Sequence, residues 1–413
     1  MDKSSTLLPE ERILAVFEGR KTKLVPFFAD LTYWYSAELR KRTLPQKYLD
    51  DKGKLLLYKD LMCGAHEELY LPIHKTIFKN VSVRVFEEEE KDGIVRTTVY
   101  YTPLGELRKV DKYSFISFST ATLKYPVNNE EDLKVLKFMY QNVEYTKKVE
   151  AFKRQEFLIN LWKGWGVVSS LPPRTPFSRL VVEWAGAYNT LILEWRSRES
   201  LREVLEVMYS SDDPIYEFIT ESPAKFVYFG ENLSSDVISP KYFEEYYKKY
   251  YTKRASMLHK AKKFIYLHID GKLRGLLPLL ASTGIDCAQS LTPYPAGDLK
   301  VSEFRKVAGD NIILWGGLPG IFFSSAYKPD LLMNLLKEIL ALCEKDRKFV
   351  IGVADQVPPD GDIQRVKLVS NIVNETFLAK SSNSNIDSSF LFESLRRVHT
   401  FLEYLSQLCF QLS

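Results

Sequence analysis

The sequence predicts an α/β protein built as a (β/α)8 barrel, with a β-hairpin excursion near residues 80–110 and a C-terminal helical tail. Apolar strand-like runs alternate with helical patterns over residues 224–376, and this alternation favours parallel strands covered by helices. A doubly wound sheet is the alternative, but no G-x-G-x-x-G or P-loop motif follows the first strand-like runs to support it. The length of 413 residues allows one large barrel with additions, and 45 % hydrophobic residues exclude a disordered chain.

The first segments combine helices with one short buried strand. Ile13, Leu14 and Phe17 recur at helical spacing, whereas the run that ends near Asp30 is continuously apolar. We expect a helix over 10–18, a strand over 23–31, and helices over 33–42 and 55–69.

Residues 80–110 change to an alternating pattern typical of strands. Two alternating runs flank a K-D-G turn, so we predict a β-hairpin in which Gly93 supplies a positive φ. A second turn follows over 102–107. The next element is a helix over 128–142 that opens with Asn and acidic residues, which are typical of a helix N-terminus.

The remainder up to residue 376 repeats strand and helix. Residues 156–167 are expected as a strand, followed by a loop over 171–179, and 180–208 as helix interrupted near 196–200. Strands are then expected over 224–232, 263–271, 285–293, 311–317 and 348–359. Helices are expected over 239–263, 273–284, 301–309, 329–345 and 362–376. Ser239 and Pro240 suit the cap and first turn of their helix, and Gly284 suits a helix end.

The last segment differs in composition, so we divide the chain into a barrel domain over 1–376 and a tail over 377–413. Residues 380–389 are polar and predict a linker, and residues 390–413 predict an amphipathic helix. This helix is expected to dock onto the barrel or onto a partner subunit, as in a homodimer; its few basic residues argue against membrane attachment.

Charge and cysteine content exclude several classes of partner. A net charge of +4 is too weak to predict nucleic acid as the main partner, and no apolar run is long enough to cross a bilayer. The first residues lack the pattern of a secretory signal, and the four cysteines form no C-x-x-C pair, so a cytoplasmic protein without disulfides is expected. A small-molecule substrate is the expected ligand.

Polar side chains gather where the predicted strands end. In a barrel these ends meet at one mouth, so residues distant in sequence converge there. The candidates are Asp30, Glu231, Asn232, His268, Asp270, Ser290, Thr292 and Asp355.

His268 and Asp270 form the strongest pair. Residues two apart in a strand point to the same face, so the imidazole and the carboxylate can face the barrel axis together. They are expected either to ligate a metal or to act as a base with its carboxylate partner, and the alternative is bonding to nearby backbone. Glu231 and Asp355 complete the candidate catalytic set, and the alternative for Glu231 is a role in capping its loop.

Further candidates would bind substrate. Arg174, Arg179 and Arg274 are candidate anion clamps, because the guanidinium fork suits carboxylate or phosphate. Tyr33 and Trp34, together with Trp162 and Trp165, could line a pocket for a flat ligand or pack in the core.

Several segments resemble the uroporphyrinogen decarboxylase superfamily, which is a family of (β/α)8 barrels. FGENLSSDVISPKYFEEYYKKYY is similar to its strand followed by L-S-P-x-x-F-E-E-F, and FIYLHIDGKLRGLLPLLASTGIDCAQSL to its H-x-x-G, helix, G-x-D unit. NIILWGGLPG, FVIGVADQVPPDGDIQRVKLV and the N-terminal RILAVFEGRKTKLVPFF resemble further family segments. The resemblance covers most of residues 10–376. The superfamily also includes cobalamin-dependent methyltransferases.

Departures from the family patterns direct the functional expectation. The paired-Arg G-R-Y signature of true decarboxylases is replaced by FFADLTYWYSAEL, and the loop over 349–366 lacks their His. The zinc methyltransferases use His-x-Cys with a distant Cys; here His268 matches, but Asp270 stands at the Cys position and the last strand has no Cys. A His and carboxylate site could still hold zinc and would favour an oxygen substrate, such as a methoxy group, over a thiol.

The resemblance therefore implies methyl transfer between a small substrate and a corrinoid protein. In this reading His268 and Asp270 bind a metal or polarise the substrate, and Glu231 or Asp355 handles a proton. The alternatives are decarboxylation of a tetrapyrrole or a smaller acid, which requires Arg40, Arg174, Arg179 or Arg274 to point into the mouth, and a non-catalytic ligand-binding barrel, which requires Tyr33, Trp34 and Trp162 to fill it.

Overall fold

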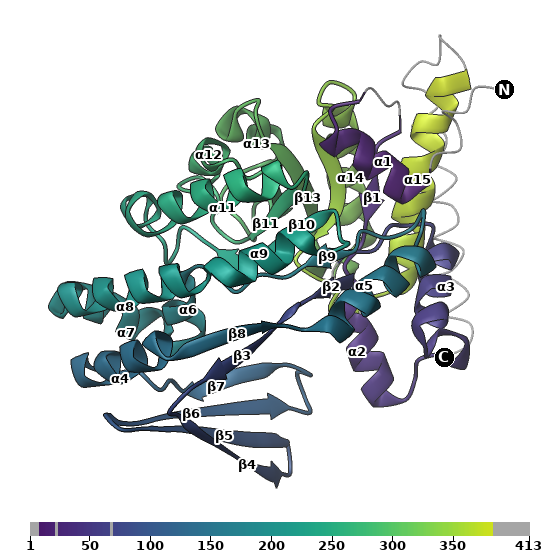
Figure 1. Ribbon diagram of the computed structural model, residues 1–413. Coiled ribbons are helices and arrows are strands. Elements are labelled where there is room, and N and C mark those ends of the chain that lie inside the picture. The colour runs from purple at the N-terminus through teal and green to yellow at the C-terminus, as the bar shows by residue number, and fades with distance from the viewer. Residues whose placement is uncertain (1–7, 21–23, 67–68, 383–413) are drawn as a thin grey trace.

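The computed structural model describes residues 8–20, 24–66 and 69–382, and within them a closed parallel barrel (Figure 1). The eight barrel strands follow one another in chain order around the sheet. They are β1 (Phe27–Phe28), β2 (Tyr70–Leu71), β9 (Ser169–Ser170), β10 (Phe226–Leu233), β11 (Phe264–Ile269), β12 (Cys287–Leu291), β13 (Ile313–Pro319) and β14 (Phe349–Ala354). The (β/α)8 prediction is confirmed.

The ring closes through the short segment that precedes β2. Gly64 N–H donates to the Phe27 carbonyl at 2.9 Å, and Ala65 N–H donates to the Trp165 carbonyl at 3.0 Å. Gly64 is needed here because a Cβ would lie 2.5 Å from the Phe28 ring. The predicted helix over 55–69 is therefore wrong beyond Leu61, where the chain turns through Met62 in the left-handed conformation and enters the sheet.

Helices connect the barrel strands and pack around the outside of the barrel. The helices are α1 (Pro9–Phe17), α2 (Thr32–Lys41), α3 (Asp51–Leu61), α4 (Glu130–Gln141), α5 (Val149–Leu161), α6 (Pro176–Arg179), α7 (Gly186–Arg196), α8 (Arg198–Ser211), α9 (Asp213–Glu221), α10 (Pro240–Tyr242), α11 (Lys248–Lys260), α12 (Leu277–Leu280), α13 (Val301–Ala308), α14 (Pro329–Cys343) and α15 (Ile363–Ser382). The helix expected over 239–263 is confirmed, with Ser239 accepting from the Tyr242 N–H as its cap.

The strand expected over 156–167 is mostly helix. α5 continues to Leu161 because Ala151, Gln155 and Leu158 are buried at helical spacing, and only the residues just before β9 enter the sheet. The apolar residues of 156–167 fit both a helical and a strand spacing, and the sequence alone does not show which side of the segment is buried.

The barrel interior is an aromatic core closed at its N-terminal end by α1. Phe17 contacts the Phe226 ring at 5.1 Å between centroids, and Trp315 packs against Phe28 and Tyr266 at 5.3 and 5.2 Å. The opposite, C-terminal end of the strands is left for the cavity described below.

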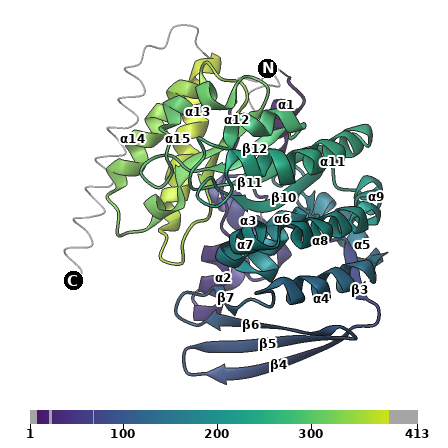
Figure 2. The same cartoon turned by 90° about the vertical axis from the view of Figure 1, so that its left-hand side faces the viewer.

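The excursion is larger than the predicted hairpin. A two-stranded ribbon, β3 (His74–Phe78) and β8 (Val143–Lys147), leads to an antiparallel sheet of β4 (Ser82–Glu90), β5 (Gly93–Thr102), β6 (Gly105–Ser114) and β7 (Thr120–Lys124). The sheet lies to one side of the barrel in both views (Figures 1 and 2). α4 begins at its predicted cap, Asn129, and packs on β6.

Gly93 is needed for a reason other than the one predicted. It is absent from the glycines with positive φ, so the expected turn conformation is wrong. A Cβ at this position would lie 2.2 Å from the Tyr113 carbonyl oxygen, because β5 and β6 pair closely there. The glycine is required by close approach of backbone rather than by turn geometry.

The C-terminal part remains partly a prediction. α15 runs through the proposed domain boundary at residue 376, and the predicted linker and amphipathic helix lie almost entirely outside the described residues. Among the helices that the structure describes, none is both long and apolar enough to cross a bilayer.

Candidate functional site

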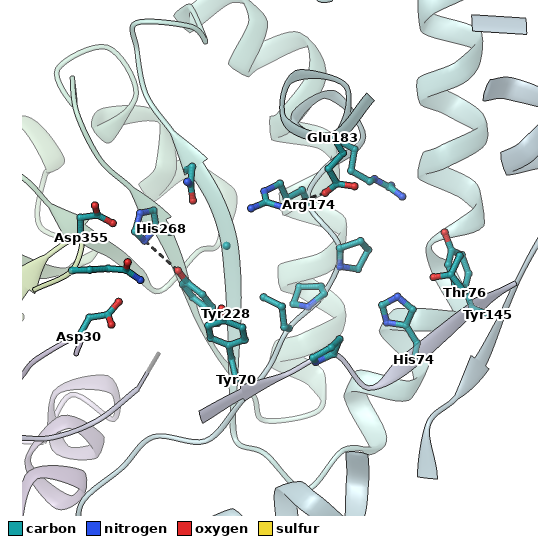
Figure 3. A pocket seen from close by; sticks show the side chains of 18 of the residues that line it. Asp30, Tyr70, His74, Thr76, Tyr145, Arg174, Glu183, Tyr228, His268 and Asp355 are labelled. Carbon is teal, nitrogen blue, oxygen red and sulfur yellow. Dashed lines mark hydrogen bonds and ion pairs between the residues drawn. The ribbon is translucent and has the colours of Figure 1, made fainter. Parts of the chain in front are cut away.

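A cavity of about 490 Å³ opens at the C-terminal ends of the barrel strands and extends to the ribbon (Figure 3). It is lined by residues of the barrel and by residues of the inserted ribbon together. The lining residues are Asp30, Tyr70, Pro72, His74, Thr76, Tyr140, Tyr145, Leu171, Pro172, Pro173, Arg174, Arg179, Glu183, Tyr228, Gly230, Asn232, His268, Asp355 and Gln356. The predicted candidates Asp30, Asn232, Arg174, Arg179, His268 and Asp355 are among them.

Three groups meet at the barrel end of this cavity. His268 is the last residue but one of β11, Asp270 directly follows that strand, and Asp355 directly follows β14. Their potential ligand atoms all lie within 4.8 Å of one another, and His268 Nε2 is 3.9 Å from Asp270 Oδ2. The structure thus brings together three of the four predicted catalytic residues.

The imidazole of His268 is held in place from the opposite edge. Its Nδ1 lies 2.9 Å from Gln289 Oε1 and 3.2 Å from the Tyr228 hydroxyl. An amide oxygen accepts hydrogen bonds and cannot donate them, so Nδ1 carries a hydrogen, and Nε2 faces the two carboxylates, where it can carry a second proton or bind a metal ion. Gln289 occupies this position because β11 and β12 pair His268 with Gln289 in register.

The backbone at the strand ends adopts conformations that ordinary residues rarely use. Asn232, Ser290 and Asp355 have φ of 55°, 73° and 63°. The Ser290 hydroxyl accepts the Asp355 N–H and so connects two of these turns. A residue other than glycine in the left-handed conformation costs free energy. Such residues are concentrated at functional sites, and Asn232 and Asp355 line the cavity here.

The environment raises the pKa of both His268 and Asp355. Burial raises the pKa of Asp355, and the nearby Asp270 carboxylate raises it further, against the opposing effect of His268. Burial lowers the pKa of His268, but the carboxylates of Asp270 and Asp355 and the bond to Gln289 outweigh it, so the net pKa is raised. Two neighbouring carboxylates therefore require a cation between them, either a proton or a metal ion.

Asp30 is buried beside this cluster and is fixed within its own turn. The N–H and hydroxyl of Thr32 donate to its Oδ1, and Gln356 donates to the Thr32 hydroxyl at 2.7 Å. This chain of bonds joins the turn after β1 to the turn after β14.

The far end of the cavity is basic. Arg174 Nη1 lies 3.2 Å from Glu183 Oε1, and the fully buried Arg179 Nη2 lies 2.6 Å from Asp212 Oδ2. Burial would lower the pKa of Arg179, but the Asp212 carboxylate outweighs it and keeps the guanidinium charged. Two of the four arginines named for the decarboxylase alternative thus face the cavity, whereas Arg40 stacks on Tyr113 and Arg274 bonds Glu303 at the surface.

Glu231 does not reach the cavity, which corrects its predicted catalytic role. Gly230 and Asn232 on either side line the cavity, so strand alternation points Glu231 into the wall. There its carboxylate accepts from the Thr175 N–H at 2.8 Å and the Thr175 hydroxyl at 3.1 Å, and burial raises its pKa.

Four of the predicted substrate-binding residues also lie elsewhere. Tyr33 bonds the Ser117 carbonyl of the small sheet, and Trp34 is packed in the core. Arg274 pairs outside the mouth, and Thr292 bonds the Ser290 carbonyl without lining the cavity. Trp162 is also packed in the core. Tyr33, Trp34 and Trp162 therefore do not fill the mouth, as a non-catalytic barrel would require.

Sequence reasoning missed several residues that shape the site. Tyr228 lines the cavity with Gly230 and Asn232, so the period of two along β10 could have found it. Gln289 could have been found only by pairing β12 with β11 in the correct register. His74 and Tyr145 come from the ribbon, which carried no site signal in the sequence.

A barrel with a polar cluster at the C-terminal strand ends defines an enzyme scaffold of the (β/α)8 class. The family model described as uroporphyrinogen decarboxylase (URO-D) matches residues 173–376, which include His268, Asp270 and Asp355. Residues 173–376, about half of the chain, are thus similar to the uroporphyrinogen decarboxylase family, and they form the larger part of the barrel.

Comparison of structures gives the same fold. A methyltransferase from Methanosarcina mazei is similar over 90 % of this chain and 99 % of its own, with a TM-score of 0.57 and 14 % identity. An octameric ribulose-1,5-bisphosphate carboxylase/oxygenase from Pyrococcus horikoshii OT3 gives a TM-score of 0.28 and 12 % identity over 64 % of this chain and 54 % of its own, which is too weak to argue from. No curated protein matches the sequence.

The donor atoms of the clustered side chains suit a divalent metal ion, and a metal at this site stays a prediction. One imidazole nitrogen with its lone pair available and two carboxylates supply three ligands, and zinc accepts this donor set. Gln289 provides the hydrogen bond to the other imidazole nitrogen that metal-bound histidines usually have. Within the described residues the set contains no thiolate, because Cys63, Cys287 and Cys343 are buried outside it.

Proposed function

We propose that the protein transfers a methyl group between a small substrate and a corrinoid carried by a partner protein. The observation that carries this proposal is the cluster of His268, Asp270 and Asp355 at one end of a cavity large enough for a small molecule. The likeness of fold to a methyltransferase supports the choice of branch within the superfamily.

His268 Nε2, Asp270 and Asp355 would hold a divalent ion, with zinc as the first candidate. Such an ion acts as a Lewis acid that makes a bound oxygen a better leaving group. Carboxylate ligands are harder than thiolates, so the set favours an oxygen donor such as a methoxy compound over a thiol.

The remaining residues orient the donor and manage the proton. In the transfer, the carbon–oxygen bond of the donor breaks and the methyl group passes to the reduced Co(I) corrinoid of the partner, which supplies both electrons of the new bond. The leaving alkoxide then takes one proton. We assign orientation of the donor oxygen to the Tyr228 hydroxyl, because it lies beside His268 and Tyr228 lines the cavity. Asp30, the remaining buried acid that lines this end, is the group we assign to proton delivery.

A reconstituted assay tests the proposal. We expect purified protein to contain about one equivalent of a divalent metal. It should also methylate free cob(I)alamin from at least one methoxy compound, and the reaction is measured by the loss of the Co(I) absorbance. His268→Ala should lower the rate by at least about 100-fold, because loss of a mere supporting partner of a metal ligand already costs about 10–100-fold. His259→Ala, at an exposed histidine of α11 outside the cavity, is the matched control. Absence of metal together with full activity of the His268 variant would overturn the proposal.

Decarboxylation of an acid is a second candidate because Arg174 and Arg179 line the same cavity. Guanidinium groups bind carboxylates and would position an acid in the cavity, where the carbon–carbon bond breaks, carbon dioxide leaves and a proton replaces it on the carbon. Release of labelled carbon dioxide from a panel of small acids, without any corrinoid, would favour this reaction instead.

A further inference from the structure

The ribbon end of the cavity contains buried nitrogen atoms that lack hydrogen-bond partners. Among the described residues, Arg174 Nε, Arg179 Nε and His74 Nδ1 are buried without a partner, and all three residues line this one cavity. A buried polar group left unpaired costs free energy, so such groups are rare unless a ligand or water completes them.

These residues come from separate elements that the fold brings to one place. His74 lies on β3, Arg174 in the loop after β9, and Arg179 at the end of α6. Figure 3 shows Arg174, Glu183, His74 and Tyr145 on the side of the cavity away from His268 and Asp355. Arg179 also lowers the pKa of His74, together with the larger effect of burial, to about 4, so the two groups are close and His74 is neutral near pH 7.

The charges that line the cavity are sorted between its two ends. The barrel end has Asp30 and Asp355, whereas the ribbon end has Arg174, Arg179 and one acid, Glu183. Asp212, which pairs with Arg179, is fully buried and does not line the cavity. Arg174 and Arg179 are thus balanced by Glu183 and Asp212, and each arginine retains a buried Nε–H without a partner.

We propose that the ribbon end is a subsite for the carboxylate of the substrate. This inference rests on the proposed function, since it places the reacting methyl group at the His268 end and the carboxylate at Arg174, Arg179 and His74. The unpaired Nε–H groups of the two arginines suit one carboxylate, whereas the neighbouring Glu183 and Asp212 carboxylates oppose a phosphate dianion. The substrate class is thus a small carboxylic acid that carries a methylated oxygen at its other end.

Binding of matched probes tests the subsite without any requirement for turnover. The probes are methoxyacetate and 4-methoxybenzoate, each compared with its neutral amide, and binding is measured by thermal-shift titration of the full chain. We expect each acid to bind at least about tenfold more tightly than its amide, because a charge-assisted hydrogen bond is stronger than a neutral one.

Variants separate the subsite from its surroundings. Arg174→Gln and His74→Phe should each weaken the acid by about tenfold or more and leave the amide nearly unchanged. His74→Phe retains a flat ring against Tyr145, and Arg198→Gln removes an arginine ion-paired with Glu245 outside the cavity as a control. Arg179 is left intact because its removal would leave Asp212 buried and unpaired.

His268→Asn distinguishes failure of the subsite from failure of the proposed function. We expect this variant to keep the preference for acid over amide within about twofold of wild type, because the carboxylate binds at the other end of the cavity. Equal binding of acid and amide, or wild-type binding by both the Arg174 and His74 variants, would overturn the subsite even if neutral donors are methylated. Selective acid binding without methyl transfer from any donor would retain the subsite and overturn the proposed function.

Discussion

His268 depends on the side chains that hold its ring as well as on its own position. Gln289 reaches it only because β11 and β12 pair in one register, and Tyr228 reaches it from β10 on the other side. The imidazole is therefore supported by both neighbouring strands of the barrel, which fixes the direction of Nε2 toward Asp270 and Asp355.

Removal of the Gln289 carboxamide should loosen this arrangement without removing a metal ligand. We expect Gln289→Leu to lower zinc affinity by about 10–100-fold, because the supporting hydrogen bond selects the imidazole tautomer and orientation. Competition with a chromophoric chelator measures the affinity independently of turnover. Thr292→Val, at a buried position near the end of the same strand but outside the cavity, should have wild-type affinity; equal losses in both variants would contradict the role of Gln289.

His74 should account for part of the loss of folding stability at acid pH. Its pKa is lowered to about 4 by burial and by Arg179, whereas an unfolded histidine titrates near 6.5. Between these values the unfolded chain binds a proton that the folded protein does not, so this group lowers stability as pH falls from about 6.5 toward 4. Urea unfolding at pH 7, 6 and 5 should show a smaller loss in His74→Phe than in wild type; identical pH profiles would contradict the assignment.

The site was predictable in part at this scale. His268, Asp270 and Asp355 follow from polar residues at the ends of apolar strands, and the structure brings them together. Glu231 follows from the same rule but faces the wall, because Tyr228, Gly230 and Asn232 line the cavity at a period of two and Glu231 falls between them. The sequence does not show which of the two alternating sets in β10 faces the cavity.

At the scale of elements, helix α4 illustrates a boundary that local chemistry determines. The Asn129 side chain accepts the Asp132 N–H, as the run of Asn followed by acids predicts. The segments that were misread, 55–69 and 156–167, lack such a signal and owe their conformation to contacts made around the barrel. Local capping is readable in a sequence, whereas a two-residue strand such as β9 exists only because its neighbours pair with it.

Substitution of the α4 cap tests this interpretation. Asn129→Ala should lower the free energy of unfolding by about 1 kcal/mol, because one helix N–H loses its acceptor. Asn129→Asp should restore most of the stability in urea unfolding. Asn160→Ala, near the exposed end of α5, serves as the control, and a loss equal to that of Asn129→Ala would contradict the capping role.

At the scale of the whole molecule, stability should differ between the barrel and the small sheet. All nine residues of β4 are exposed and the strand pairs only with β5, whereas all seven residues of β13 are buried between two neighbours. Local opening is easiest where few contacts are lost.

Hydrogen exchange measured by mass spectrometry should therefore be faster in peptides from β4 than in peptides from β13. The measurement should be repeated after dilution, because an edge strand that pairs with a second copy would be protected at high concentration. Protection of β4 equal to that of β13 at every concentration would contradict the expectation.

The ribbon of β3 and β8 has a consequence for how this architecture diversifies. It contributes His74, Thr76 and Tyr145 to a cavity whose reactive end is built from barrel strands alone. Sequence changes within this one inserted segment can therefore alter which molecules the cavity binds, while the side chains at the reactive end stay the same. Exchange of this segment between relatives would change substrate specificity without altering those side chains.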